Sequence, residues 1–267
     1  MSQLSLGEPS AAPGGSCTLK LTVAYDGTDF HGFAAQRDQR TVEEVLAEAL
    51  GRVLRGPVAL SCAGRTDAGV HAWGQVVSAT VGVETDPLLV ARSVNSQLAP
   101  EIVVRSAELV APDVHARHSA IWRSYRYTIV NRDFPDPFRA RYSWWVHEPL
   151  DLSMMRLAAD PFIGEHDFAS FCRKGPEGSS TVRRVLASDW HDEGDGLLVF
   201  EIRAAAFCWQ MVRSIVGTLV DVGIGKITPG DVMAILRARD RSVAGRIAPP
   251  QGLCLFQVGY PLSTVRS

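Results

Sequence analysis

The chain has 267 residues, of which 46% are apolar and 21% are charged, and its formal net charge is −2. This length suits one large domain or two closely joined ones, and the apolar share excludes a disordered chain. The nearly neutral charge balance excludes a uniformly basic surface, so any contact with RNA must rest on local basic patches.

Cysteine usage and hydropathy point to a protein of the cytoplasm. The five cysteines are odd in number and show no Cys-x-x-Cys spacing. This pattern argues against a zinc site and against a disulfide framework, and it fits a reducing compartment. The start of the chain has no basic region followed by an apolar run, and no apolar stretch reaches the length of a bilayer. We therefore expect a cytoplasmic protein with no membrane segment and no metal.

The first elements in chain order form one half of the protein, residues 17–112. Residues 1–16 are small, polar and rich in Pro and Gly, which is typical of a flexible tail. Thr41 and Glu44 have the spacing of a capping box ahead of a helix, and Asp86-Pro87 open a second helix. Alternation of apolar residues predicts strands over residues 19–25, 58–62, 75–81 and 102–110.

The pattern restarts in the second half, residues 113–267. A long strand over 120–130 alternates aromatic and basic residues, and the turn 192–196 predicts a hairpin. The remaining predicted elements are helices over 152–162, 208–222 and 229–239 and strands over 182–190, 197–204 and 253–258. Two halves that each combine strands with helices on one side indicate an α+β architecture.

The loop Gly64–His71 is the strongest chemical signal in the chain. Glycines on both sides of Asp67 permit sharp turns and the close approach of a ligand. Asp67 is the only carboxylate of the loop and follows Arg65 by two residues. From these residues alone, a tight turn with a solvated aspartate remains the simpler interpretation, and a catalytic carboxylate is the alternative.

A second signal lies on the strand that contains Tyr125-Arg126-Tyr127. Alternation places Tyr125, Tyr127 and Arg123 on one face and Arg126 on the other. An aromatic ring beside arginines can stack on an unpaired base while the cations hold phosphates. A pair of tyrosines facing the core is the competing interpretation.

The third signal is Arg213, which lies beside an apolar helical stripe that contains Met211, Val212, Ile215 and Val216. A buried arginine needs an anionic partner, whereas an arginine at the rim can extend its head to solvent. Both interpretations remain open from the sequence.

Basic residues cluster in two regions and predict local RNA-binding patches. The first cluster contains Arg117, Arg123, Arg126, Arg132, Arg139 and Arg141, and the second contains Arg173, Lys174, Arg183 and Arg184.

The pair His115 and His118 has no third ligand at a suitable spacing, so we expect no metal there.

Together these segments resemble the tRNA pseudouridine synthase A (TruA) family, from about Leu19 to Tyr260. The string Gly64-Arg65-Thr66-Asp67-Ala68-Gly69-Val70-His71-Ala72 is the most specific part of the resemblance. The other segments agree in order and spacing, and they are 25–33, 115–120 with Tyr125, 207–217 and 248–253.

The resemblance implies a function, a fold and partners. The function is the conversion of uridine to pseudouridine in the anticodon stem-loop of tRNA, at positions 38 to 40, on a nucleotide flipped out of its stack. The fold is the pseudouridine-synthase fold, in which two RRM-like or ferredoxin-like α+β halves join mainly antiparallel sheets and leave a cleft between them. The family uses no cofactor and no metal, and its members are homodimers in which one tRNA spans both subunits.

The resemblance also assigns roles by position. Asp67 matches the catalytic aspartate, and Tyr125 matches the tyrosine that stacks on the target base and helps to remove its C5 proton. Arg213 matches the arginine that pairs with the aspartate, and Arg65 matches the arginine that holds the RNA around the flipped nucleotide. We expect Arg117, Arg123 and Arg126 to bind RNA more generally.

Some positions depart from the family pattern, and they bear on substrate range. Ala34-Ala35 stand where Gln-x is expected, Ala205 stands where a small polar residue is usual, and Cys208-Trp209 stand where Leu-Tyr is common.

Two rival functions remain. One is a non-catalytic RNA-binding protein on the same fold. The other is a carboxylate hydrolase, which needs a metal cluster or a second acid near Asp67. The candidates for that second acid are Asp26 and Asp29, which the sequence favours as turn residues.

Overall fold

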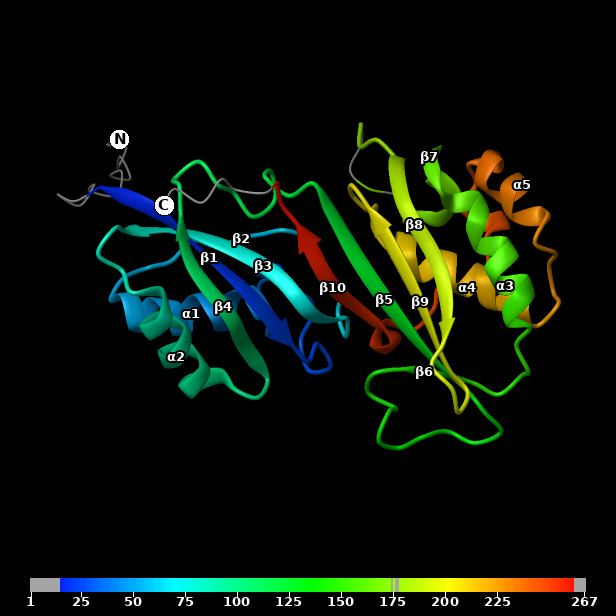
Figure 1. Ribbon diagram of the computed structural model, residues 1–267, viewed down its shortest axis with the longest axis horizontal. Coiled ribbons are helices and arrows are strands. Elements are labelled where there is room, and N and C mark those ends of the chain that lie inside the picture. The colour runs from blue at the N-terminus through cyan, green and yellow to red at the C-terminus, as the bar shows by residue number, and fades with distance from the viewer. Residues whose placement is uncertain (1–14, 174, 176–177, 262–267) are drawn as a thin grey trace, which may run out of the picture.

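Within the described residues, ten strands join in one mainly antiparallel sheet, with five α-helices gathered into two groups (Figure 1). The computed structural model describes residues 15–173, 175 and 178–261. The strands are β1 (Ser16–Tyr25), β2 (Ser61–Cys62), β3 (His71–Gly82), β4 (Ile102–Val110), β5 (Trp122–Asn131), β6 (Trp144–Val146), β7 (Gly164–Asp167), β8 (Val182–Asp192), β9 (Leu197–Ala204) and β10 (Leu253–Gly259). The helices are α1 (Val42–Leu54), α2 (Pro87–Leu98), α3 (Leu152–Ala159), α4 (Met211–Gly223) and α5 (Asp231–Ala238).

The order of strands across the sheet is β4-β1-β3-β10-β5-β9-β8-β7, with β2 beside β3 and β6 beside β5. Among the strand pairs of the described residues, only β10–β3 and β5–β6 are parallel. The α+β class and the joined, mainly antiparallel sheet are therefore confirmed. The boundary predicted after residue 112 falls between β4 and β5, but β10 comes from the second half and pairs directly with β3 of the first half.

One face of the sheet continues from the first half into the second. Tyr25 of β1 is paired with Ala72 of β3, which is paired in turn with Leu255 of β10. Leu255 is paired with Tyr125 of β5, and Tyr125 with Ile202 of β9. Directly paired residues point to the same side of a sheet, so these five buried side chains share one face. They belong to one hydrophobic core with the buried residues of α1 and α4.

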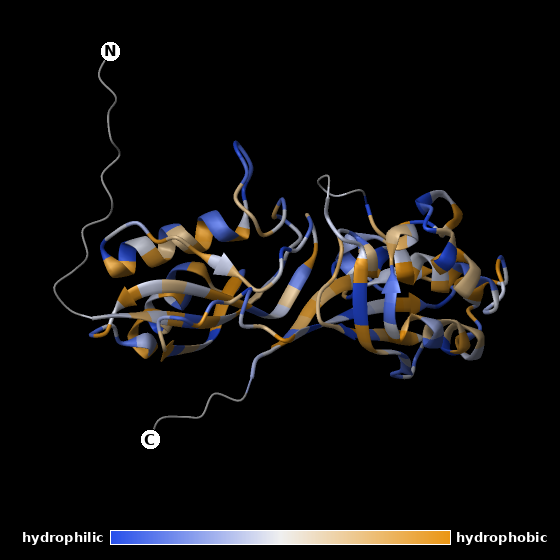
Figure 2. Cartoon of the chain, turned by 90° about the horizontal axis from the view of Figure 1, so that it is seen from above, coloured by the Kyte–Doolittle hydropathy of each residue, from blue (hydrophilic) through white to orange (hydrophobic). Residues whose placement is uncertain are grey.

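Figure 2 shows the two helical groups as separate lobes with strands and loops between them. The helices α1 and α2 pack on each other in one lobe, and α3 packs on α4 in the other. Among the described residues, no helix is both long enough and apolar enough to cross a membrane.

The capping box predicted at the start of α1 is wrong. Thr41 occupies the N-cap position, but its hydroxyl is buried and forms no hydrogen bond in the described structure. The first amides of the helix are satisfied by backbone carbonyls instead, because Val42 N–H donates to Gly32 and Glu43 N–H donates to Phe33. A helix whose end is covered by neighbouring backbone needs no side-chain cap. In α2, by contrast, which begins at the predicted Asp86-Pro87, the Asp86 carboxylate accepts hydrogen bonds from two first-turn amides.

Several boundaries differ from the prediction. Strand β3 begins at His71 rather than at residue 75, because His71 is already paired with Cys254 of β10. Strand β2 contains only Ser61–Cys62 of the predicted 58–62, and the short strands β6 and β7 were not predicted. Strand β1 starts at Ser16, inside the predicted tail, and residues 1–14 of that tail lie outside the described residues.

Candidate active site

The Asp67 carboxylate is held by two side chains from the other half of the protein. Asp67 lies in the loop between β2 and β3. Its Oδ2 lies 3.3 Å from Nη1 of Arg213, and its Oδ1 accepts a hydrogen bond of 3.0 Å from Nε1 of Trp209. The Arg213 side chain is 13% exposed and that of Asp67 is 26% exposed, so solvent only partly screens the pair. The site therefore lies at the junction of the two halves, where the sequence predicts the active cleft.

Buried polar side chains hold the loop in place. Gln75 is fully buried and donates from Nε2 to the Gly64 carbonyl over 2.6 Å. The hydroxyls of Tyr25 and Thr66 lie 2.8 Å apart. Because buried polar groups are costly to leave unpaired, this network favours a single conformation of the loop.

The backbone of Gly32 and Phe33 also holds the loop in place, through a close contact with Thr66. The Phe33 N–H donates to the Thr66 carbonyl over 3.0 Å. Gly32 precedes it with φ of +94°, and a Cβ there would lie 2.8 Å from the Thr66 carbonyl oxygen. Only glycine combines this dihedral angle with this contact.

Arg213 is anchored before it reaches Asp67. It lies in the first turn of α4, and its Nε donates to the Ala248 carbonyl over 2.7 Å. The Ala248 N–H in turn donates to the Arg213 carbonyl over 3.0 Å. The structure therefore gives Arg213 the anionic partner that a largely buried arginine needs, and it brings Arg213 together with Asp67 as the family pattern implies.

Tyr125 lies close to the loop with a free phenolic oxygen. A Cβ on Gly64 would lie 3.6 Å from that oxygen, and the ring of Phe207 packs edge-on at 5.0 Å between centroids. None of the described residues forms a hydrogen bond with the oxygen. Burial raises the pKa of Tyr125 above its ordinary value, and the negative charge of Asp67 raises it further. The phenol is therefore neutral at physiological pH.

The structure separates the arginines that the sequence groups together. Arg65 and Arg117 are exposed. Arg126 is on the face of the sheet opposite to Tyr125, where it pairs with Glu201 at 3.1 Å and stacks on Phe256 at 3.6 Å.

Arg123 is a buried structural residue, and this corrects its predicted place at an RNA surface. It is 8% exposed, and its guanidinium donates only to backbone carbonyls, those of Ala63, Arg117, Ala120 and Ala205. The carbonyls explain the burial, because a buried guanidinium requires acceptors for its donors. The side chain supports the start of the loop that bears Asp67, and its expected contact with RNA gains no support.

The acids proposed as hydrolytic partners are engaged elsewhere. Asp26 accepts hydrogen bonds from Thr28 and from the Tyr142 hydroxyl, and Asp29 pairs with Arg141 at 3.0 Å. Burial opposes ionisation of Asp26, but these hydrogen bonds outweigh it and hold the pKa of its carboxyl below the ordinary value. The described residues contain no group of three His, Cys, Asp or Glu side chains that could hold a metal.

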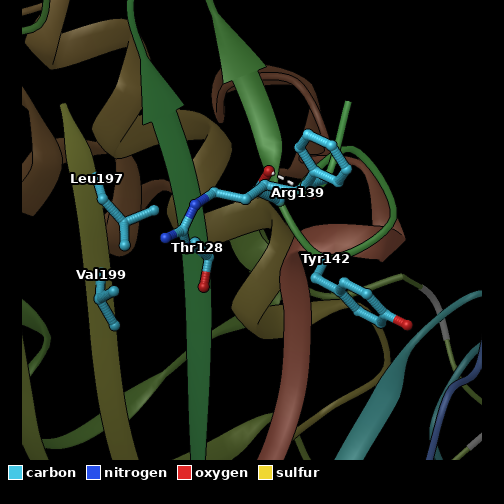
Figure 3. A pocket seen from close by; sticks show the side chains of 7 residues that line it. Thr128, Arg139, Tyr142, Leu197 and Val199 are labelled. Carbon is cyan, nitrogen blue, oxygen red and sulfur yellow. Dashed lines mark hydrogen bonds between the residues drawn. The ribbon is translucent and has the colours of Figure 1, made fainter. Parts of the chain in front are cut away.

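Two cavities lie away from Asp67, on the opposite face of the sheet. One of about 440 Å³ is lined by Thr128, Phe138, Arg139, Tyr142, Ser143, Leu197 and Val199 (Figure 3). Thr128 and Val199 are paired on β5 and β9, and alternation places them opposite to Tyr125 and Tyr127. The other cavity, of about 400 Å³, includes Trp73 and Arg105. Neither is lined by a carboxylate, so neither extends the Asp67 site.

Sequence reasoning missed three residues of the site. Tyr25 and Gln75 were assigned only to strands, although their side chains hold the loop. Alternation could have placed them on the inner face, but not beside Gly64 and Thr66. Trp209 was noticed only as a departure from the family pattern, and nothing local in the sequence indicates that its indole reaches Asp67.

Comparison with known proteins gives consistent matches. A family model described as tRNA pseudouridine synthase matches residues 21–119 and 158–261. A tRNA pseudouridine synthase A of Leifsonia xyli is 40% identical, over 91% of this chain and 92% of the relative. Those of Methylobacterium nodulans and Bacillus subtilis are 43% and 39% identical, over 91% of this chain and 95% and 98% of the relatives.

Replacement of Arg123 by Leu should destabilise the protein, whereas replacement of Arg117 by Leu should not. Arg123→Leu leaves buried carbonyls without donors, and each such group costs about 1–3 kcal/mol, so we expect a loss of about 2–4 kcal/mol in the free energy of unfolding. Arg117→Leu changes an exposed side chain and should stay within about 0.5 kcal/mol of wild type. Urea unfolding followed by circular dichroism measures both, and equal stabilities would contradict the structural role of Arg123.

Proposed function

This chain belongs to the tRNA pseudouridine synthase family, and we propose that Asp67 is the carboxylate with which it isomerises uridine to pseudouridine in tRNA. The observation that carries the proposal is the Asp67 carboxylate itself, partly buried and held by Arg213 and Trp209 at the junction of the two halves. A solvated turn aspartate has no need of two such partners. The alternative of a non-catalytic RNA-binding protein is not favoured by this family membership.

The chemistry requires an anionic group beside the ribose. The reaction breaks the N1–C1′ bond, rotates the detached uracil, forms a C5–C1′ bond and moves the C5 proton to solvent while N1 gains one. A carboxylate can add to C1′ or assist the departure of the base. The Arg213 guanidinium lies 3.3 Å from the Asp67 carboxylate and offsets its negative charge, and its own bond to Ala248 keeps it in position. No cofactor is needed for this redox-neutral rearrangement.

We propose that Tyr125 contacts the target base and handles the C5 proton. Its oxygen is near Gly64 and is not engaged by any described residue, so it is free to meet a substrate. Because its pKa is raised, the phenol carries its own proton. The oxygen can therefore accept the C5 proton only as it passes its own proton on to solvent or substrate. This requirement makes Tyr125 a relay rather than a preformed base.

The substrate region follows from family resemblance, and the exposed arginines fit it. We propose the anticodon stem-loop, at positions 38 to 40, as the target. The nucleotide must leave its stack to reach a carboxylate in a loop, at a cost of a few kcal/mol. Arg65 is exposed two residues before Asp67, where it can hold the phosphate of a flipped nucleotide, and Arg117 offers a second exposed cation. We also propose a cytoplasmic location, where tRNA is modified.

Asp67→Asn should abolish product formation and spare binding. The amide keeps the shape and nearly the volume of the carboxylate but lacks the anionic oxygen, so activity should fall to background. Affinity for tRNA should stay near wild type or rise slightly, since a negative charge is withdrawn from a site that binds a polyanion. Tritium release from C5-labelled uridine in tRNA measures turnover, beside filter binding. Tyr125→Phe in the same assay should bind normally and react slowly. Release at the wild-type rate by Asp67→Asn would exclude Asp67 as the catalytic group.

Salt dependence of binding should identify which arginines meet phosphate. The logarithm of the tRNA affinity should fall linearly with the logarithm of salt concentration. Arg65→Ala and Arg117→Ala should each reduce the slope by about 1, because each removes one phosphate contact. Arg126→Ala is the comparison: the sequence predicts that Arg126 also binds RNA, but its guanidinium pairs with Glu201 on the opposite face, so we expect this variant to leave the slope unchanged. An affinity independent of salt, or a slope changed only by Arg126→Ala, would show that the assigned surface is wrong.

Family resemblance alone leads us to propose a homodimer. Light scattering at micromolar concentration should return twice the 29.0 kDa mass of the chain. A mass of 29.0 kDa under those conditions would count against a dimer.

A further inference from the structure

Trp209 contacts the Asp67 carboxylate from a position where the family pattern has another residue. Its indole Nε1 donates to Asp67 Oδ1 over 3.0 Å, and the residue is 47% exposed. We propose that Trp209 is a positioning residue that sets the orientation of the Asp67 carboxylate for attack on the ribose. The proposal rests on the catalytic role of Asp67 proposed above.

Hydrogen bonds to both carboxylate oxygens of Asp67 restrict its Cβ–Cγ torsion more than a single hydrogen bond does. The Cβ–Cγ torsion of an aspartate is broad, because it joins an sp³ carbon to a planar group. Arg213 reaches Oδ2 at 3.3 Å, which is longer than the usual 2.7–2.9 Å of a charge-assisted hydrogen bond, and Trp209 reaches Oδ1 at 3.0 Å. The shorter, neutral contact therefore contributes to the orientation of the carboxylate plane without adding a second positive charge.

The indole is itself held in place. The Arg173 guanidinium stacks over the ring at 4.2 Å from its centroid, and the Arg173 N–H donates to the Trp209 carbonyl over 2.9 Å. The next residue, Gln210, has φ of 60°, which turns the chain sharply between Trp209 and the start of α4. Because of this turn, Trp209 and Arg213, at the two ends of the segment 209–213, both donate to the Asp67 carboxylate. A preorganised donor costs little reorganisation when the reaction occurs.

The test removes the N–H and keeps an aromatic ring. Trp209→Phe retains a face for Arg173 to stack on but cannot donate to Asp67. Trp73→Phe is the matched control, because Trp73 is 50% exposed and has Arg105 stacked at 3.9 Å, but it lies on the opposite face of the sheet. Single-turnover rates at saturating enzyme are measured by tritium release from C5-labelled uridine in tRNA, with the dissociation constant from filter binding.

We expect Trp209→Phe to lose roughly tenfold in the single-turnover rate, the order of one hydrogen bond to a charged group. Its dissociation constant for tRNA should stay within about twofold of wild type, and Trp73→Phe should match wild type in both quantities. Trp209→His, which offers a ring N–H on a shorter side chain, should recover part of the rate. If Trp209 contributed only to folding, its replacement would not lower the single-turnover rate while leaving the dissociation constant for tRNA unchanged.

Two results would overturn the proposal. A normal rate for Trp209→Phe would show that Arg213 orients the carboxylate alone. If Trp209→Phe binds tRNA more weakly but keeps the wild-type single-turnover rate at saturating enzyme, Trp209 contacts RNA instead. Asp67→Asn separates these failures from failure of the proposed function. If Asp67→Asn is inactive while Trp209→Phe is normal, only the positioning role is lost, and if Asp67→Asn is active, the proposed function itself fails.

Discussion

The pairing of β10 with β3 on one side and β5 on the other is the constraint on which the site depends. β10 is the last strand of the chain, yet it lies in the middle of the sheet and joins the two halves. Asp67 comes from the loop before β3, whereas Arg213 comes from the first turn of α4 and Trp209 from the residues just before that helix. The three groups meet only if the halves hold a fixed relation, and the shared sheet and continuous core supply it. A carboxylate on one half with its partners on the other is oriented by the whole fold rather than by its loop.

Buried polar groups hold the loop that bears Asp67. They favour one conformation of that loop, but each would lower the stability of the protein if it lost its partner. Gln75, Tyr25 and Thr66 form a buried network, and Arg123 donates to the Ala63 carbonyl just before Gly64. Each of these groups would be costly if left unpaired, so alternative loop conformations that break one contact are strongly disfavoured. The loop that bears Asp67 is thereby held by several buried contacts, although it is rich in glycine.

The sequence predicted what depends on local pattern. The strand alternation of β1, the start of α2 at Asp86-Pro87 and the hairpin between β8 and β9 are all local, and each is confirmed. The motif around Asp67 indicated the catalytic loop through its resemblance to a family, since the residues alone left a simple turn open. The prediction of a capping box at Thr41 failed for a nonlocal reason. The carbonyls of Gly32 and Phe33, which lie outside the helix, already accept hydrogen bonds from its first amides.

What the sequence could not predict depends on groups that meet across the fold. Arg123 and Arg126 look alike in the sequence, three residues apart in one arginine-rich strand. One is buried against four carbonyls and the other pairs with Glu201 on the opposite face. Alternation assigned their faces, but it could not tell which face would be covered. The indole of Trp209 reaching Asp67 depends in the same way on a turn at Gln210 and on Arg173, and neither has a local signature.

The charges of the site resolve an apparent conflict between a carboxylate and a polyanionic substrate. A chain with a net charge of −2 gains no general attraction for RNA, and Asp67 adds local repulsion. Arg213 lies close enough to offset that charge, and because it is largely buried, the compensation is only weakly screened by salt. Arg65 and Arg117, which are exposed, can then serve phosphate without being drawn to Asp67. In the proposed function, a buried cation beside Asp67 and exposed cations for the RNA backbone let one site hold RNA with a carboxylate close to it.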